Sequence, residues 1–425
     1  MTVAASDAFV TRVQQRVRWS WLWAPRTDLL WNLLPFWLGF VLAAALYATR
    51  GTGPSAEDPG WTFSIAGRTV SVMAVMVYFY GPLVDAPHLW GTIARTYTDP
   101  GEWTTRRRLL LGSLTLFLIG PAVILLPYAL RALVALPAGA ETLGWQLWSW
   151  VLSFYVIFHI NRQHWGFVSL YRRKNGENGE GGRPAEDRWD SMFFHIAIWL
   201  PYFAMLTAPW YLEVQNQPIA AMQIAVGPTT LGAILYTSCQ LAFFAICAAY
   251  ALFQVVKWRK GVTRNGPKLI YIATILSLYW VTFTLHPRLA AFWVLITSTG
   301  HCAQYHAVVW AYGRKKYVAG ESSKQRGLPA AIFGNLWLYI VLGLVFGLLT
   351  AQGPGAGHFK RAIAHVLESG VFSWAFAFLD PKQGLDLGIK VAAAFVAGVR
   401  LHHFYVDSKI WRVTKSPALA KNLNV

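Results

Sequence analysis

Charged residues are scarce in this chain. Only 13% of its 425 residues are Asp, Glu, Lys or Arg, while 55% are hydrophobic. Soluble domains carry about 25% charged residues, so this composition excludes a large soluble domain and indicates a polytopic membrane protein. The remaining charge is mostly positive, with a formal net value of +18. We attribute this excess to basic loops on the cytoplasmic side of a membrane rather than to nucleic-acid binding.

Cysteine is also rare. The three cysteines, Cys239, Cys247 and Cys302, all lie inside apolar runs and form no CxxC pair. This pattern excludes a disulfide framework and gives no support to a thiolate zinc site. The sequence also has no Gly-rich nucleotide-binding loop and no Walker motif, so a nucleotide-binding domain is not expected.

Apolar runs of membrane-spanning length fill most of the sequence. They predict an all-α fold, a polytopic helical bundle with a single membrane domain over residues 28–406. The ten runs cover 28–49, 69–91, 109–130, 144–171, 191–210, 230–256, 269–285, 290–313, 329–350 and 387–406.

Basic residues alternate between the loops that join these runs. If the N-terminus is cytoplasmic, the cytoplasmic segments hold 27 Lys and Arg, and the opposite loops hold 7. Such a bias sets topology, so we expect both termini inside, in a bacterial-type inner (cytoplasmic) membrane. The expected segments are a cytoplasmic N-terminus 1–27, a mobile cytoplasmic loop 172–190, an extracytoplasmic segment 351–386 and a cytoplasmic tail 407–425. Within 351–386, residues 359–379 are expected to form either an interfacial helix or a re-entrant segment.

Histidines gather at one depth of the predicted bundle. Four of them precede a cytoplasmic basic residue by six to eight positions: His88, His164, His306 and His403. At 1.5 Å per residue, their rings are expected within about 3 Å of one another along the membrane normal. His159 and His301 lie about one turn deeper. Ionisable side chains within spans are costly and usually face a bundle interior, so a shared depth indicates a shared site.

Two of these histidines have a carboxylate on the same helix face. Asp85 precedes His88 by three residues, and Asp407 follows His403 by four. Imidazole with carboxylate is the ligand set of a mixed metal site, and it favours iron or manganese over Cu(I). The carboxylates are expected to be ligands or hydrogen-bond partners of the histidines. The alternative is that they only cap helix ends or pair with basic residues at the headgroups.

The stretches HINRQH and HCAQYH, which begin at His159 and His301, share the spacing H-x4-H. Five residues rotate by about 140° on a regular helix, so two such histidines bind one ion only if a π-bulge lies between them. Otherwise each helix supplies one ligand, supported by Gln163 or Tyr305. An internal duplication and plain interhelical hydrogen bonds are the alternatives.

A candidate site follows from these patterns. The candidate metal ligands are His88, His159, His164, His301, His306, His402 and His403. Asp85, Arg162, Tyr305 and Asp407 are the candidate catalytic or supporting residues. Arg162 and Arg400 are expected either to neutralise the two carboxylates or to hold the head group of an anionic amphiphile.

The histidine-rich cytoplasmic ends resemble the integral-membrane histidine-box enzymes, namely the fatty-acid desaturases and hydroxylases, and the membrane β-carotene-cleaving dioxygenases. The matching positions are His88, His159, His164, His301, His306, His402 and His403. The desaturase boxes read HxxxH and HxxHH, whereas this chain has H-x4-H twice and an HH pair at His402 and His403. The resemblance implies a non-haem iron that activates oxygen against a lipid chain.

These observations predict a membrane oxidoreductase with a metal near the cytoplasmic face. The expected cofactor is non-haem iron, with zinc, manganese, copper and haem as alternatives. The expected partners are a lipid or other apolar small-molecule substrate and a separate electron-donor protein, because no redox domain is recognisable in the sequence. A transporter or channel with a histidine-lined site and a haem-binding membrane protein remain alternative functions.

Overall fold

A computed structural model describes most of the chain. The described residues are 17–48, 62–65, 67–71, 80–131, 133–137, 139–140, 142–177, 184–208, 223–285, 294–319, 327–350, 384–423 and 425. They divide into two compact units. Unit 1 comprises Met1–Gly60, Ile160–His301 and Asn424–Val425, and unit 2 comprises Trp61–His159 and Cys302–Leu423. Two helices, α8 (Thr142–Lys174) and α14 (Thr299–Gly313), run through the points of division.

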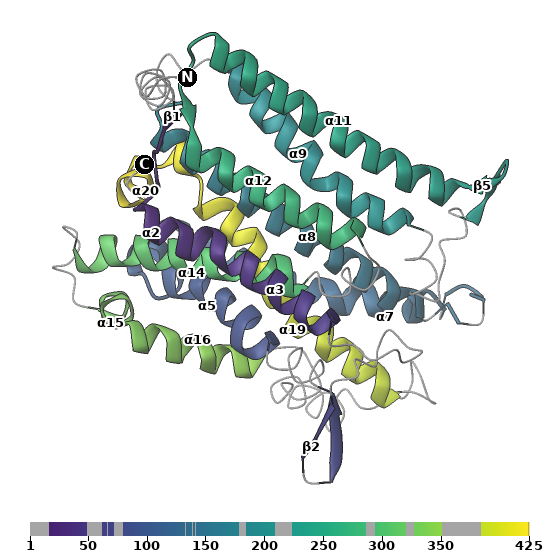
Figure 1. Cartoon of the computed structure of the whole chain (residues 1–425). Helices are drawn as coiled ribbons and strands as arrows, with labels where there is room; N and C mark the ends of the chain where they lie inside the picture. The colour runs from purple at the N-terminus through teal and green to yellow at the C-terminus, as the bar shows by residue number, and fades with distance from the viewer. Residues whose placement is uncertain are drawn as a thin grey trace. The chain divides into compact units, whose positions relative to one another are not determined.

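Unit 1 is built mainly from helices, of which α9 and α11 lie side by side and α12 packs against α9 (Figure 1). Its helices, besides the second part of α8, are α2 (Pro25–Asp28), η1 (Leu29–Leu33), α3 (Leu34–Ala48), α9 (Pro184–Thr207), α11 (Leu231–Arg259), α12 (Gly266–Trp280), η5 (Val281–Leu285) and η6 (Val294–Ser298). Its short strands pair as β1 (Val17–Arg18) with β6 (Arg264–Asn265), parallel, and β4 (Ala225–Val226) with β5 (Thr229–Thr230), antiparallel.

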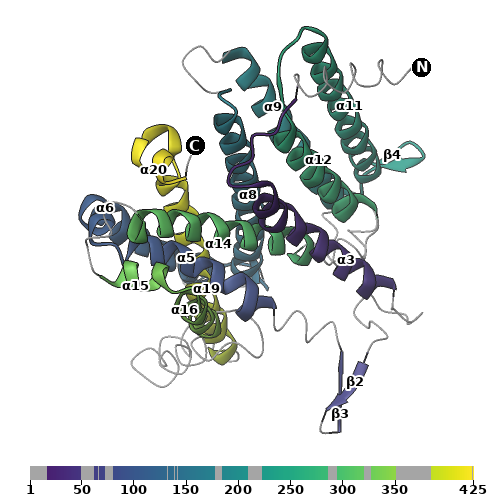
Figure 2. The same cartoon turned by 60° about the vertical axis from the view of Figure 1, so that its left-hand side comes forward.

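Unit 2 carries the candidate site. In it α19 packs against α7 and η3, and α16 packs against η2. Helix α16 also packs against α5, as Figure 2 shows. Its helices, besides the first part of α8 and most of α14, are η2 (Gly81–Asp85), α5 (Ala86–Thr96), α6 (Pro100–Ser113), η3 (Leu114–Leu118), α7 (Ile119–Arg131), η7 (Arg314–Val318), α15 (Leu328–Gly334), α16 (Leu336–Thr350), α19 (Gly384–Ile410), η9 (Val413–Lys415) and α20 (Pro417–Leu423). One antiparallel hairpin joins β2 (Thr62–Ile65) to β3 (Arg68–Ser71).

Local sequence explains where several of these helices begin. Asp99 caps α6 by accepting a hydrogen bond from the Gly101 amide at 2.8 Å, and Pro100 occupies the first helical position. Asn265 caps α12 in the same way, through the Lys268 amide at 3.2 Å. Each cap satisfies a backbone donor that the first turn of a helix leaves unpaired.

Small residues bring α19 close to its neighbours. A Cβ added to Gly120 on α7 would lie 2.9 Å from the Ala394 carbonyl oxygen of α19 and 2.8 Å from Trp148 of α8. A Cβ on Gly398 of α19 would lie 2.5 Å from the Cα of Phe117. Small residues at such crossings allow backbones to approach within a membrane, where packing rather than the hydrophobic effect holds helices together. This packing fixes α19, which carries His403 and Asp407.

Six described helices are long and apolar enough to cross a membrane: Pro25–Ala45, Pro100–Arg131, Thr142–Lys174, Leu231–Arg259, Gly266–Leu285 and Leu387–Ile410. The pair α15 and α16 passes the same test together but is bent by 104°, which makes seven if it is one span. The all-α prediction is therefore confirmed, and a membrane protein is supported. The count of ten spans, the single membrane domain and the orientation stay predictions.

Two predicted segments differ in detail from the structure. The apolar run 69–91 begins in strand β3 rather than in a helix. Polar Thr69 and Ser71 alternate with Val70 in this strand, which follows a turn at Gly67, where φ is +75°. The predicted loop 172–190 is shortened from both sides, since α8 reaches Lys174 and α9 begins at Pro184. The predicted segment 351–386, with 359–379 inside it, lies outside the described residues except for the start of α19.

Candidate metal centre

Helices α5, α8 and α19 of unit 2, with the π-helical turn η2, bring several of the candidate residues together. Helix α5 supplies His88 directly after the π-helical turn η2, which ends at Asp85. Helix α8 supplies His159, and α19 supplies His403 and Asp407. All of these side chains except Asp85 are buried, with at most 7% of their surface exposed. The site therefore lies inside the unit rather than on its surface.

The first group of ligand atoms comes from His159, His403 and Asp407. One ligand atom from each lies within 4.8 Å of the other two. The rings of His159 and His403 have centroids 4.8 Å apart, and His403 Nδ1 lies 3.7 Å from Asp407 Oδ2. The i,i+4 pair that the sequence indicated on α19 thus gains a second histidine from another helix. Two imidazoles and a carboxylate are a ligand set for a divalent metal.

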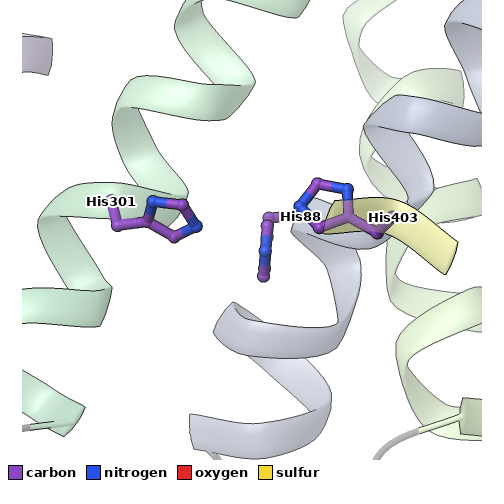
Figure 3. Close-up of side chains that lie close together, drawn as sticks. All are labelled: His88, His301 and His403. Carbon is purple, nitrogen blue, oxygen red and sulfur yellow. The ribbon is translucent and has the colours of Figure 1, made fainter. Parts of the chain in front are cut away.

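A second group comes from Asp85, His88 and Cys302, again with ligand atoms within 4.8 Å of one another. Cys302 Sγ lies 3.3 Å from His88 Nδ1, and the same nitrogen contacts the backbone oxygen of Asp85. The rings of His88 and His403 are 4.9 Å apart between centroids and nearly perpendicular, so the two groups are neighbours. Figure 3 shows these two rings together, and it also draws His301 of α14.

A hydrogen-bond network surrounds Asp407. Its Oδ1 accepts hydrogen bonds from the hydroxyls of Thr92, at 2.8 Å, and Tyr305, at 2.9 Å. His403 Nδ1 lies 2.6 Å from the same Thr92 oxygen. If both hydroxyl protons point to Asp407, Nδ1 of His403 must carry the proton that it shares with Thr92. His403 then presents Nε2 as its ligand atom, the arrangement in which an outer partner orients a metal-binding imidazole.

The remaining predicted residues of unit 2 have other partners. Arg400 forms an ion pair with Asp85, which is one of the two carboxylates that it was expected to neutralise. His402 Nε2 lies 2.8 Å from the Tyr97 hydroxyl, and His306 Nδ1 lies 2.9 Å from the Tyr339 hydroxyl. Neither of these two histidines belongs to a potential metal group among the described residues, and their assignment as ligands stays a prediction.

Four predicted residues belong to unit 1. His164 Nδ1 lies 3.0 Å from the Tyr271 hydroxyl, and the side chain of Arg162 is exposed. The Gln163 amide donates to the backbone oxygen of His301 at 2.9 Å. His301 is the last residue of unit 1, one position before Cys302, and it is not counted among the ligands of unit 2.

Neither H-x4-H stretch contains the π-bulge that would let its two histidines bind a single ion. α8 and α14 are regular α-helices through His159–His164 and His301–His306, so neither pair can bind one ion as an i,i+5 chelate. The π-helical turns lie instead on either side of α14, in η6 and η7, and immediately before α5, in η2. The alternative, in which each of these two helices supplies one ligand, stays a prediction.

Two residues of the site were not anticipated. Cys302 gave no metal-binding pattern because its partner His88 lies 214 residues away in the sequence. Thr92 has no ionisable group, although it follows His88 by one helical turn and so faces the same side of α5. Their only sequence signals are this spacing and the position of Cys302 directly after His301.

No protein-family model matches the chain, and no curated protein and no solved structure matches it either.

Proposed function

We propose that this chain is a membrane oxidoreductase that holds a non-haem iron through His159, His403 and Asp407 and acts on a lipid or other apolar substrate. The observation that carries the proposal is the approach of two histidines and one carboxylate, from two helices, to within 4.8 Å inside unit 2. This set, with further positions open to other ligands, is typical of non-haem Fe(II) oxygenases. Bound iron supplies oxygen activation.

The surrounding residues are suited to hold and orient the ligands. Thr92 and Tyr305 both donate to Asp407, which satisfies hydrogen-bond acceptors of this buried carboxylate and fixes its position. Thr92 also holds Nδ1 of His403. Partners of this kind set the tautomer and direction of a ligating imidazole and raise metal affinity.

The environment supports an apolar substrate. The ring of His159 stacks on Phe404, with centroids 4.2 Å apart, and Tyr155 stacks on the same phenylalanine at 5.9 Å. Helices α8 and α19, which carry the three ligands, are both apolar enough to span a membrane. A substrate that reaches the site from the bilayer would meet aromatic side chains beside the ligands.

We further propose an inner-membrane location and a separate electron-donor protein.

Metal analysis of the detergent-purified full chain tests the proposal. Wild-type protein is expected to contain about one iron per chain, and His159→Ala and His403→Ala to lose it, since a facial triad needs all three ligands. His402→Ala is the matched control, because His402 neighbours His403 on α19 but contacts Tyr97. Iron-free wild type, or retention of iron in both ligand variants, would contradict the assignment.

A second assay tests the reaction class. Ferrous protein, supplied with a one-electron reductant and extracted membrane lipid, is expected to consume oxygen above the rate of His403→Ala, with oxidised lipid found by mass spectrometry. A transporter would instead move metal into sealed proteoliposomes without consuming oxygen. That result would replace the oxidoreductase with the transporter alternative while leaving the metal ligands in place.

A further inference from the structure

We propose that Asp85, His88 and Cys302 form a second metal site, next to the iron group but with separate ligands, and that it binds zinc. This inference goes beyond the proposed function, because it requires no reaction and shares no ligand with His159, His403 and Asp407. It assigns a role to Cys302, which that function does not use.

The distances already approach those of a tetrahedral zinc site. Zinc binds sulfur at about 2.3 Å and imidazole nitrogen at about 2.05 Å, so a tetrahedral angle separates the two ligand atoms by about 3.6 Å. The observed separation of Cys302 Sγ from His88 Nδ1 is 3.3 Å. For carboxylate oxygen the same geometry requires about 3.4 Å, and Asp85 Oδ1 lies 3.8 Å from His88 Nδ1. These two separations differ from the required ones by only a few tenths of an ångström, and the ligand atoms of all three residues lie within 4.8 Å of one another. In binding zinc, His88 Nδ1 would exchange its contact with the Asp85 backbone oxygen for the ion.

The charges also suit a divalent ion. Cys302 and His88 are almost fully buried, and a thiolate in such a place needs a compensating positive charge. Zinc would supply it, while Arg400 pairs with the other oxygen of Asp85 and orients that carboxylate. The mixture of sulfur, nitrogen and oxygen favours zinc, since oxygen-only sites select magnesium or calcium.

The site would join two segments that are distant in the sequence. Asp85 and His88 flank the start of α5, where the π-helical turn η2 gives way to an α-helix, and Cys302 lies in the first turn of α14. A shared ion at this point would hold α5 against α14. Its three protein ligands leave a fourth position for water or another small ligand.

Cys302→Ser in the full-length, detergent-purified chain tests this site. Wild type is expected to contain about one zinc per chain, and Cys302→Ser almost none, while its iron content is unchanged. Cys239→Ser is the matched control, because Cys239 lies on α11 of unit 1 and is expected to leave both metals in place. Monodispersity in size-exclusion chromatography checks that each variant is folded.

Cobalt provides a readout that zinc content alone does not. Protein loaded with Co²⁺ is expected to show a thiolate-to-cobalt charge-transfer band that Cys302→Ser lacks and Cys239→Ser keeps. Full zinc in Cys302→Ser, or the absence of this band from wild type, would show that Cys302 only hydrogen-bonds His88 and would overturn the second site. Zinc without iron in wild type would overturn the proposed function and leave the second site standing. Iron without zinc would overturn the second site and leave the proposed function standing.

Discussion

Asp407 illustrates what a buried carboxylate requires at the scale of single residues. Burying a charge is costly unless donors surround it, and Thr92 and Tyr305 both donate to the same oxygen of Asp407. The residue pair His403 and Asp407 was recognisable from its spacing, but the donors come from α5 and α14 and could be found only from the structure. The network thus ties three helices to one carboxylate.

Tyr305→Phe is expected to weaken this network without changing the packing of the ring. Loss of one donor to a buried carboxylate should lower the free energy of unfolding by about 1–3 kcal/mol. It should also lower metal affinity about 10–100-fold, as the loss of an outer hydrogen bond usually does. Chemical denaturation and metal titration measure the two effects. Tyr155→Phe, in which the ring that stacks on Phe404 is kept, is the control and should change neither quantity substantially.

Arg95 is a buried cation held by aromatic rings. Its guanidinium lies 3.6 Å from the ring centroid of Trp411 and 4.4 Å from that of Tyr312, and Nη2 donates to the Ile410 carbonyl at 2.9 Å. Only 1% of the residue is exposed. The planar, weakly hydrated guanidinium suits such stacking better than an ammonium does.

Arg95→Lys should therefore destabilise the protein although the charge is kept. We expect a loss of about 1–3 kcal/mol, because both the stacking and the hydrogen bond are disturbed. Thermal denaturation in detergent would measure it. Arg314→Lys is the comparison, since Arg314 is exposed and 6.0 Å from the Trp310 ring centroid. Equal stability of the two variants would show that the stacking around Arg95 contributes little.

At the scale of helices, close packing predicts which glycines can be replaced. Gly120→Ala would force its new methyl group against Trp148 and the Ala394 backbone, so we expect a loss of about 1–3 kcal/mol. Gly112→Ala, where no atom lies within 4 Å of the added Cβ, should be neutral or stabilising by up to about 1 kcal/mol. Denaturation of the two variants side by side measures the difference, and similar values would contradict the packing of α7 against α19.

The start of α6 is joined to η7 by a polar contact outside the spans. Lys316 Nζ and the Tyr317 hydroxyl each lie 2.6 Å from Asp99 Oδ2. Burial alone would raise the pKa of Asp99, but these two hydrogen bonds and the Lys316 charge hold its pKa below the ordinary value of 3.8. The contact is therefore fully stabilising above the unfolded pKa and is lost as the pH falls through the folded pKa.

Acid titration of stability tests this contact. Wild type should lose stability progressively as the pH is lowered from about 5 to 3, because Asp99 takes up a proton on unfolding. Asp99→Asn should be less stable than wild type at pH 7 and should show a smaller loss over the acid range. Glu102→Gln is the control, because Glu102 lies 3.6 Å from Lys316 Nζ, whereas Asp99 lies 2.6 Å from it. Identical acid profiles for Asp99→Asn and wild type would exclude Asp99 as a contributor.

The presence of the long helices could be predicted from the sequence, because long apolar runs mark them. Every predicted apolar run contains described helix, because lipid-facing and core-facing positions are both apolar and a helix satisfies its own backbone. Hydropathy does not separate the short and mostly polar strand β3 from the apolar run that follows it, which is why β3 was missed. It also does not locate bends, such as the one between α15 and α16.

The site was predictable only where its residues share a helix. Spacing identified Asp85 with His88 and His403 with Asp407, since i,i+3 and i,i+4 neighbours share a face. Which helices meet depends on packing between distant segments, so the pairing of His159 with His403 and of His88 with Cys302 could not be derived. The expectation of a shared depth in the membrane selected the candidate histidines, but depth alone does not determine which of them meet.

At the scale of the whole molecule, orientation in the membrane is the property that most needs a test. The bias of basic residues, 27 against 7, predicts cytoplasmic positions for Thr105 and Ser408 and an extracytoplasmic position for Thr229. All three side chains are exposed in the structure. Each can therefore be replaced by cysteine and labelled, in a chain that carries Cys239→Ser and Cys247→Ser and keeps the buried Cys302.

Labelling with a membrane-impermeant maleimide is expected to modify Thr229→Cys in intact cells, and Thr105→Cys and Ser408→Cys only in inverted vesicles. The physical reason is that translocating Lys and Arg across the membrane is costly, so basic segments stay inside. The unsubstituted background is the control for Cys302. Labelling of Thr105→Cys in intact cells would reverse the orientation and place the histidine-bearing helix ends outside. An electron donor on the cytoplasmic side could then not reach the metal, so this single result also bears on the proposed partner.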